Sequence, residues 1–228
     1  MNDSRNFTQG RIFAPLVRFA LPVLLALFLQ TMYGAVDLLV VGQFGTAADV
    51  SAVSTGSQLM HSVTVVITGL AMGLTAFVAQ NIGAGKPERA RRALLCGIVS
   101  SLAAGIVMAS LTFFHGQTLA GFFAKDPAVI LAAAEYLKAY AVDCLLTSFL
   151  FCFMGYFNGC SCTTFVMLQG IIGAFGVRLP VSWLMSRQVP VSLFRIGLAT
   201  PASTTVQILL CGVYFLVLLR RQRREALR

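Results

Sequence analysis

The sequence contains few charged residues for its length. Asp, Glu, Lys and Arg make up 11% of its 228 residues and hydrophobic residues make up 57%, whereas a soluble domain carries about 25% charged residues. A soluble globule of this size would need polar surface that this sequence does not offer. The composition also excludes a disordered chain, a polypeptide that coats nucleic acid and a disulfide-stapled secreted domain. We therefore expect an all-α membrane protein built from membrane-spanning segments.

The motifs of enzymes and metal sites are also missing. The chain has no H-E-x-x-H and no G-x-S-x-G, and G-A-G-K at 83–86 lacks the spacing and the following Ser or Thr of a phosphate-binding loop. Cys160 and Cys162 have no second ligand pair and no His nearby, so this pattern favours packing over metal binding. We expect no enzymatic activity, no cofactor and no metal.

Six apolar segments are long enough to cross a bilayer, whose hydrocarbon core of ~30 Å needs about 20 helical residues. We expect helices at about 14–42, 53–82, 91–114, 129–157, 163–186 and 194–219. In the second connection, Gly85 suits the end of one helix and Pro87 the first turn of the next. No A-x-A cleavage site follows the polar N-terminus, so the first segment is expected to remain as a span. The sequence predicts a single bundle of six transmembrane helices over residues 1–228.

The basic residues are distributed unevenly, although the net charge is +9. Most of the 17 Lys and Arg residues fall in three places: Arg5, Arg11 and Arg18; Lys86, Arg89, Arg91 and Arg92; and Arg220, Arg221, Arg223, Arg224 and Arg228. The positive-inside rule then places both termini in the cytoplasm, with 220–228 as a basic tail of a multi-pass inner-membrane protein. Aromatic residues do not alternate with these charges, so we expect membrane lipids and no nucleic acid as partners.

Asp37 and Asp143 lie deeper inside predicted spans than the other carboxylate there, Glu135, and ionisable groups at such positions are costly and point to function. Asp37, in the first span, either binds a proton or small cation, or reaches the interface or a pairing cation as a structural group. Asp143 lies near the middle of the fourth span. At about 100° per residue, Tyr136, Tyr140, Asp143 and Thr147 share one face of that helix. This stripe offers charge and ring faces to a cationic substrate, or else hydrogen-bonds a neighbouring helix without any ligand.

Other charged residues in the spans have a structural interpretation. Glu135 and Lys138 are three residues apart near the outer end of the fourth span, and we expect them to form a structural ion pair. Arg178, in the fifth span, either extends outward to the interface or pairs with a carboxylate such as Glu135 or Asp143.

Prolines and glycines mark irregular points of the predicted helices. We expect Pro22, Pro180 and Pro201 to interrupt the first, fifth and sixth spans. Transporters often place such breaks beside their pathway, although Pro and Gly are generally more frequent in membrane helices than in soluble ones. Close helix approach is expected at glycines of the second and fifth spans: Gly69, Gly73, Gly170, Gly173 and Gly176.

Several longer strings resemble the multidrug and toxic compound extrusion (MATE) family of transporters. The similar strings near the N-terminus are A-L-P-V-L-L-A-L-F-L-Q-T-M-Y-G-A-V-D-L-L-V-V-G, A-A-D-V-S-A-V-S-T-G-S-Q and T-G-L-A-M-G-L-T-A-F-V-A-Q-N-I-G-A-G-K-P-E-R-A. F-M-G-Y-F-N-G-C and R-L-P-V-S-W-L-M-S resemble the closing helices of the family. The resemblance covers nearly the whole chain, and the combined strings are more specific than any one of them.

The resemblance implies secondary active efflux of organic cations or other xenobiotics. Members of the family exchange protons or sodium ions for their substrates by alternating access. Asp37 matches the family's acidic position in the first helix, which takes part in ion coupling, and Asp143 is similar to an acidic position of the second lobe. We expect Asp143, with Tyr136 and Tyr140, to form the substrate or ion site.

The resemblance also covers only about one lobe of a MATE transporter, because family members have about a dozen helices in two pseudo-symmetric lobes. The first two predicted helices resemble the opening of the first lobe, whereas 82–228 resembles later helices of the second, as a deletion joining both lobes would produce. We therefore expect transport to require a homodimer or a full-length transporter as partner. The alternatives are a non-transporting remnant or assembly partner, and a flippase for lipid-linked precursors.

Overall fold

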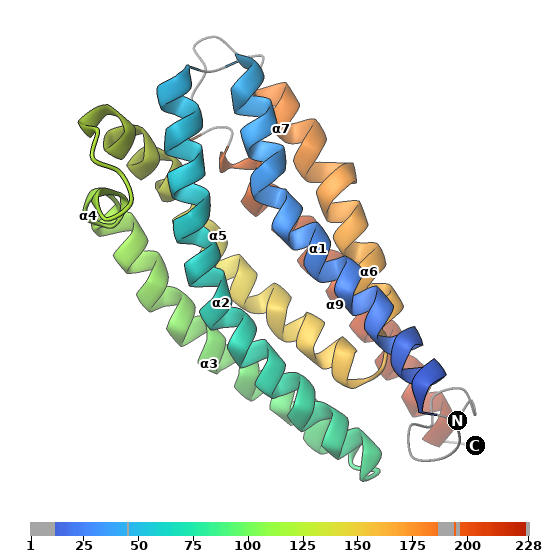
Figure 1. Ribbon diagram of the computed structural model, residues 1–228. Helices are drawn as coiled ribbons and strands as arrows, with labels where there is room; N and C mark the ends of the chain where they lie inside the picture. The colour runs from blue at the N-terminus through green and yellow to red at the C-terminus, as the bar shows by residue number, and fades with distance from the viewer. Residues whose placement is uncertain (1–11, 45, 187–193, 195–196, 227–228) are drawn as a thin grey trace.

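The computed structural model describes residues 12–44, 46–186, 194 and 197–226, which form helices and no strand. The helices are α1 (Phe13–Phe44), α2 (Ala47–Gly83), α3 (Pro87–Phe114), α4 (Gly116–Gly121), α5 (Pro127–Gly159), α6 (Thr163–Ile171), the π-helix η2 (Ile172–Arg178), α7 (Leu179–Ser186) and α9 (Ala199–Ala226). They form an elongated bundle of roughly aligned rods (Figure 1). The predicted all-α architecture is confirmed.

Within the described ranges, five helical segments are long and apolar enough to cross a membrane. They are α2, α3, α5, the continuous run of α6, η2 and α7 over Thr163–Met185, and Ala199–Arg220 of α9. A shorter apolar stretch, Phe13–Leu29, begins α1, which extends over 32 residues as one helix. Five candidate spans and one shorter apolar stretch therefore lie where the sequence predicts six spans.

Side-chain caps explain why two helices begin earlier than predicted. The hydroxyl of Thr46 accepts from the backbone N–H of Asp49, and the Asp49 carboxylate accepts from the Thr46 N–H at 2.8 Å. This capping box starts α2 at Ala47 rather than at 53. Asp126 similarly accepts from the Ala128 N–H at 2.9 Å and starts α5 at Pro127. The short helix α4, which the sequence analysis did not predict, lies in the preceding connection.

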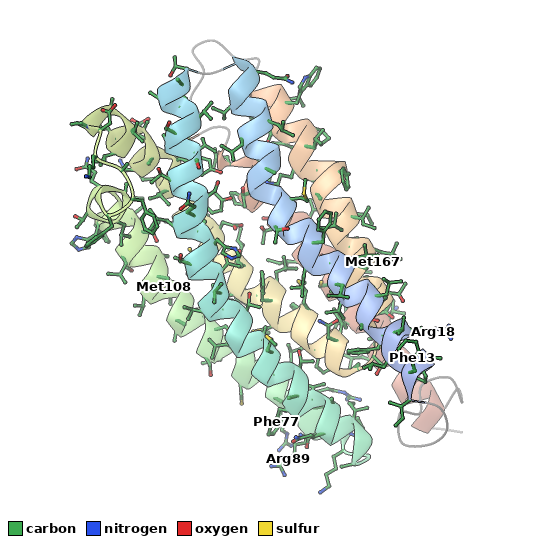
Figure 2. All side chains as sticks on the ribbon, in the orientation of Figure 1. Phe13, Arg18, Phe77, Arg89, Met108 and Met167 are labelled. Atoms are coloured by element: carbon green, nitrogen blue, oxygen red, sulfur yellow. The ribbon has the colours of Figure 1, made fainter. Side chains whose placement is uncertain are left out.

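The turn between α2 and α3 follows the predicted chemistry. Gly85 has φ 69°, a left-handed conformation that glycine adopts without steric cost, and Pro87 is the first residue of α3. The guanidinium of Arg89 lies 5.9 Å from the ring centroid of Phe77, close to this turn (Figure 2). The turn lies at the same end of the bundle as Arg18 and the beginning of α1, and α9 also ends there (Figures 1 and 2). The basic clusters among the described residues therefore gather at one end.

Helix α5 is the central element of the bundle. In the apolar 18-residue stretch of its membrane span, 61% of the residues are buried, whereas the share is 17–33% in the other candidate spans. A Cβ on Gly155 would lie 2.6 Å from the carbonyl oxygen of Ala71, and one on Gly159 would lie 2.8 Å from that of Thr75. These two glycines let α5 and α2 approach closely. The expected close approach at Gly69 and Gly73 is wrong, because no atom of the described part of the chain lies within 4 Å of a Cβ at either position.

The three prolines take different places in the helices. Pro22 lies inside α1, which continues through it. Pro180 is the second residue of α7, directly after the π-helix η2, so irregular backbone does accompany it. Pro201 lies in the first turn of α9 rather than inside a helix, because α9 begins at Ala199. A missing N–H there costs no helical hydrogen bond.

Candidate functional site

A polar layer crosses the middle of α5 between two apolar clusters. One cluster includes Val129, Leu137 and Cys144, and the other includes Leu150 and Phe157. Between them lie Asp143, Thr147 and Ser148, all of which are buried. The apolar clusters fix the position of α5, so the polar side chains are held where their neighbours can reach them.

The Asp143 carboxylate receives a hydroxyl on each oxygen. Thr147, one turn further along α5, donates to Oδ2 at 2.9 Å. Thr204 of α9 donates to Oδ1 at 2.6 Å. The second contact joins two helices that are far apart in the sequence, and it places Asp143 at the α5–α9 interface.

Arg178 of η2 is a further polar residue of this layer, in addition to those from α5 and α9. It is the last residue of η2, it is buried, and its Nη2 donates to the hydroxyl of Tyr140 at 2.9 Å. Arg178 and Asp143 both line the cavity described below. Arg178 is therefore buried and does not extend outward to the interface, and its pairing with a carboxylate stays a prediction; Asp143 lines the same cavity, whereas Glu135 is exposed.

The π-helix is held against α9 by polar contacts. Ser203 donates to the carbonyl oxygen of Gly173 at 2.8 Å, and Gln207 donates to the Ser203 hydroxyl at 3.1 Å. A π-helix leaves carbonyls misaligned for α-helical bonding, and π segments often occur at functional sites. Gly173 has no room for a side chain, because Gln207 packs directly over it.

The two tyrosines of the predicted stripe have different surroundings. Their rings meet edge to face, with centroids 5.2 Å apart. Tyr140 borders the cavity described below, whereas Tyr136 is fully buried and packs against Gly56 of α2. The structure thus brings Tyr140, Asp143 and Thr147 to the site and places Tyr136 behind them in the core.

A cavity of about 950 Å³ opens beside this layer. Its walls come from α1, α2, α5, α6, η2 and α9, with Phe123 from the connection before α5. Asp143, Arg178 and His61 are the ionisable groups of its wall among the described side chains, together with Tyr140. Most of the remaining wall is apolar or carries hydroxyl and amide groups. The cavity can therefore hold an amphiphilic small molecule beside a buried charge.

The geometry around Asp143 accommodates either protonation state. The Thr204 hydroxyl lies 2.6 Å from Asp143 Oδ1 and 3.0 Å from the carbonyl oxygen of Thr200. When Asp143 is ionised, Thr204 donates to the carboxylate. When Asp143 is protonated, it can donate to Thr204, and Thr204 then donates to the Thr200 carbonyl. Proton uptake and release at Asp143 need no movement of these heavy atoms.

Two predicted site residues lie outside this layer, and the side chain of a third is not among the described ones. Glu135 and Lys138 are both exposed, and no ion pair joins them, so the expected structural ion pair is not formed. Exposed side chains near a helix end can each be hydrated, and such pairs gain little. Asp37 lies in α1, but its side chain falls outside the described part of the structure. Its predicted role in ion coupling stays a prediction.

The sequence analysis missed the contribution of α6 and α9. Four polar residues of α9, Thr200, Ser203, Thr204 and Gln207, recur at helical spacing within an otherwise apolar segment, and all four line the cavity. Gln169 of α6 lines it as well. The spacing of the α9 residues on one face is the signal that could have found them.

Comparison with known proteins places the fold and the family. The MatE family model matches residues 22–184. Multidrug resistance protein PmpM of Pseudomonas aeruginosa is 29% identical over 173 residues, which are 74% of this chain and 35% of that protein. Multidrug resistance protein NorM of Vibrio vulnificus is 31% identical over 172 residues, again 74% of this chain and 36% of that protein. This chain thus spans about a third of the length of these curated relatives.

Solved structures show the same architecture. The crystal structure of MATE in the bent conformation superposes with a TM-score of 0.79 at 22% identity, over 87% of this chain and 44% of that one. The sequence predicts that the chain resembles about one lobe of a MATE transporter. The length of the match confirms this prediction, because the matched part is less than half of the solved transporter. Because the MatE family model matches residues 22–184, which are most of its length, this chain belongs to the MatE family.

Proposed function

We propose that the chain takes part in secondary active efflux of organic cations and other xenobiotics across the inner membrane. One observation carries the proposal: a cavity of about 950 Å³ with the buried carboxylate of Asp143 in its wall. Cavities that bind drug-sized molecules typically measure about 300–1,000 Å³ and contain a few polar groups in an apolar lining. The relatives named multidrug resistance proteins support the same function.

Asp143 would link cargo to the coupling ion through its charge. When ionised, the carboxylate attracts a cationic cargo, and the Tyr140 ring offers a second favourable surface. When a proton or sodium ion occupies the site, that attraction weakens while Arg178 stays positive and repels the cargo. Exchange follows because cargo and coupling ion compete for the same negative charge. Asp37 is proposed as a second coupling position on α1, from its match to the family's acidic position.

Transport in this scheme needs a second lobe. The solved relative is more than twice as long as the matched part, and the cavity of this chain is bounded by helices of one lobe. We propose that a second copy of the chain supplies the opposite wall of the cavity. A full-length transporter is the alternative partner that could supply this wall. Crosslinking in membranes should then yield a dimer, and a strictly monomeric chain would contradict this part of the scheme.

The function is tested by ethidium efflux from cells that lack their own drug pumps. Cells expressing the chain should accumulate less ethidium than cells carrying an empty vector. Asp143→Asn keeps the size of the side chain and removes the charge, so it should abolish the difference at equal protein level. Glu135→Gln makes the same chemical change at an exposed position of the same helix and should leave efflux intact. Full efflux by Asp143→Asn would overturn the proposal.

A further inference from the structure

One glutamine in the cavity wall has a side-chain amide without a partner. Gln169 of α6 is 1% exposed, and neither its Oε1 nor its Nε2 forms a hydrogen bond with any side chain or backbone group that the structure describes. Gln207, which lines the same cavity, is different because its Nε2 donates to Ser203. Buried amides are nearly always hydrogen-bonded, and leaving both atoms unpaired is costly inside a membrane. The amide of Gln169 is therefore available to a molecule in the cavity.

The surroundings of Gln169 leave room for such a molecule. Gly170, the next residue, also lines the cavity, and no atom lies within 4 Å of where its Cβ would sit. Two further unpartnered hydroxyls line the same cavity from other helices, Ser57 of α2 and Thr200 of α9. Unpaired polar groups on three helices thus border one cavity whose other walls are largely apolar.

We propose that Gln169 is a specificity-determining residue that recognises ligands presenting a hydrogen-bond donor and an acceptor side by side. A primary amide offers one acceptor and two donors in one plane, and it binds best to a flat group with the complementary pair. Imides, lactams and carboxamides on an apolar ring system carry such a pair. This inference rests on the proposed function, since it takes the cavity as the cargo site, and it adds a neutral class of cargo that Asp143 alone would not select.

Two related probes separate this recognition from simple partition into an apolar cavity. 1,8-Naphthalimide carries an imide N–H between two carbonyls, and N-methyl-1,8-naphthalimide replaces that hydrogen with a methyl group. Both are fluorescent, flat and apolar. A site built to pair with a donor rejects the analogue that lacks it. The purified full chain in detergent should bind the N–H imide about tenfold more tightly than the N-methyl imide.

Gln169→Leu should remove this preference, so that both probes bind with the affinity of the N-methyl imide. Replacing an unpaired buried amide with an apolar side chain should also raise the thermal unfolding temperature. Gln169→Met provides a second apolar variant with an unbranched side chain, and its binding should match that of Gln169→Leu. Gln80→Leu makes the same change on the exposed surface of α2, away from the cavity, and should keep the full preference.

The inference is overturned if wild type shows no preference, or if both Gln169 variants retain it. If both probes bind equally well to wild type, Gln169 has no such role, while the cavity still accepts small molecules. Failure of the efflux proposal would instead appear in the ethidium assay with Asp143→Asn. The two failures are therefore distinguishable.

Discussion

Thr204 and Thr205 are neighbours on α9, but their hydroxyls have different partners. Thr204 donates to the carboxylate of Asp143, whereas Thr205 is exposed and donates to the Pro201 carbonyl of its own helix. Thr204→Val should destabilise the chain by about 2 kcal/mol, because it leaves a buried carboxylate oxygen without its donor. Thermal unfolding in detergent measures this loss. Thr205→Val should change stability little, and an equal loss in both variants would contradict the role assigned to Thr204.

Tyr140 offers a second test at the scale of single side chains. Its hydroxyl accepts from Arg178 at 2.9 Å, and its ring borders the cavity. Tyr140→Phe keeps the ring and removes the acceptor, so Arg178 loses one fixed contact in a buried site. We expect weaker ethidium efflux and a lower unfolding temperature. Tyr140→Ala should weaken efflux further, because it also removes the ring. Efflux unchanged in both variants would remove Tyr140 from the site.

At the scale of elements, the close crossing of α2 and α5 depends on two glycines. A Cβ at Gly155 would lie 2.6 Å from a backbone oxygen of α2, which cannot move without shifting the helix. Gly155→Ala should therefore destabilise the bundle by about 1–3 kcal/mol. Gly73→Ala places a methyl group in open space on α2 and should be neutral or slightly stabilising. Unfolding temperatures of the two variants compare them directly, and a stable Gly155→Ala would show that the helices separate easily.

Patterns within one helix could be predicted from the sequence, whereas contacts between helices could not. The spacing of Tyr140, Asp143 and Thr147 places them on one face of α5, and the structure shows them at one site. Thr204 reaches Asp143 only because α9 packs against α5, 61 residues further along the chain. The expected close approach is confirmed at Gly173, which Gln207 of α9 covers, but it fails at Gly69 and Gly73 for the same reason. Gly69 and Gly73 have the spacing of a packing motif but meet no helix, while Gly155 and Gly159 do.

The π-helix η2 illustrates a second limit of sequence analysis. Pro180 marks an irregular region, but a proline alone does not show whether the helix kinks, breaks or widens. The backbone form of this region depends on two residues of α9. Ser203 donates to the carbonyl oxygen of Gly173, and Gln207 covers Gly173. The π-helical backbone in turn places Arg178 beside Tyr140. The π-helix η2, which contacts with α9 hold in place, therefore positions Arg178, a residue for which the sequence left two alternatives.

For the whole molecule, the distribution of charge predicts which end faces the cytoplasm. The turn before α3, which contains Lys86, lies at the basic end, and Lys125 precedes α5 in a different connection. Cysteines introduced as Lys86→Cys and Lys125→Cys, in a background without the native cysteines, should be labelled from opposite sides by a membrane-impermeant maleimide. We expect labelling of Lys86→Cys only after the cells are opened. Labelling of both from one side would contradict the six-span arrangement.

The most direct test of the account is ethidium movement in liposomes that contain only the purified chain. An imposed gradient of protons, and separately one of sodium ions, should drive ethidium across the membrane with wild type under at least one of the two conditions. Asp143→Asn should show no gradient-driven movement, while Glu135→Gln should match wild type. Wild-type flux no greater than in protein-free liposomes under either gradient, or equal flux with Asp143→Asn, would contradict the proposed exchange at Asp143.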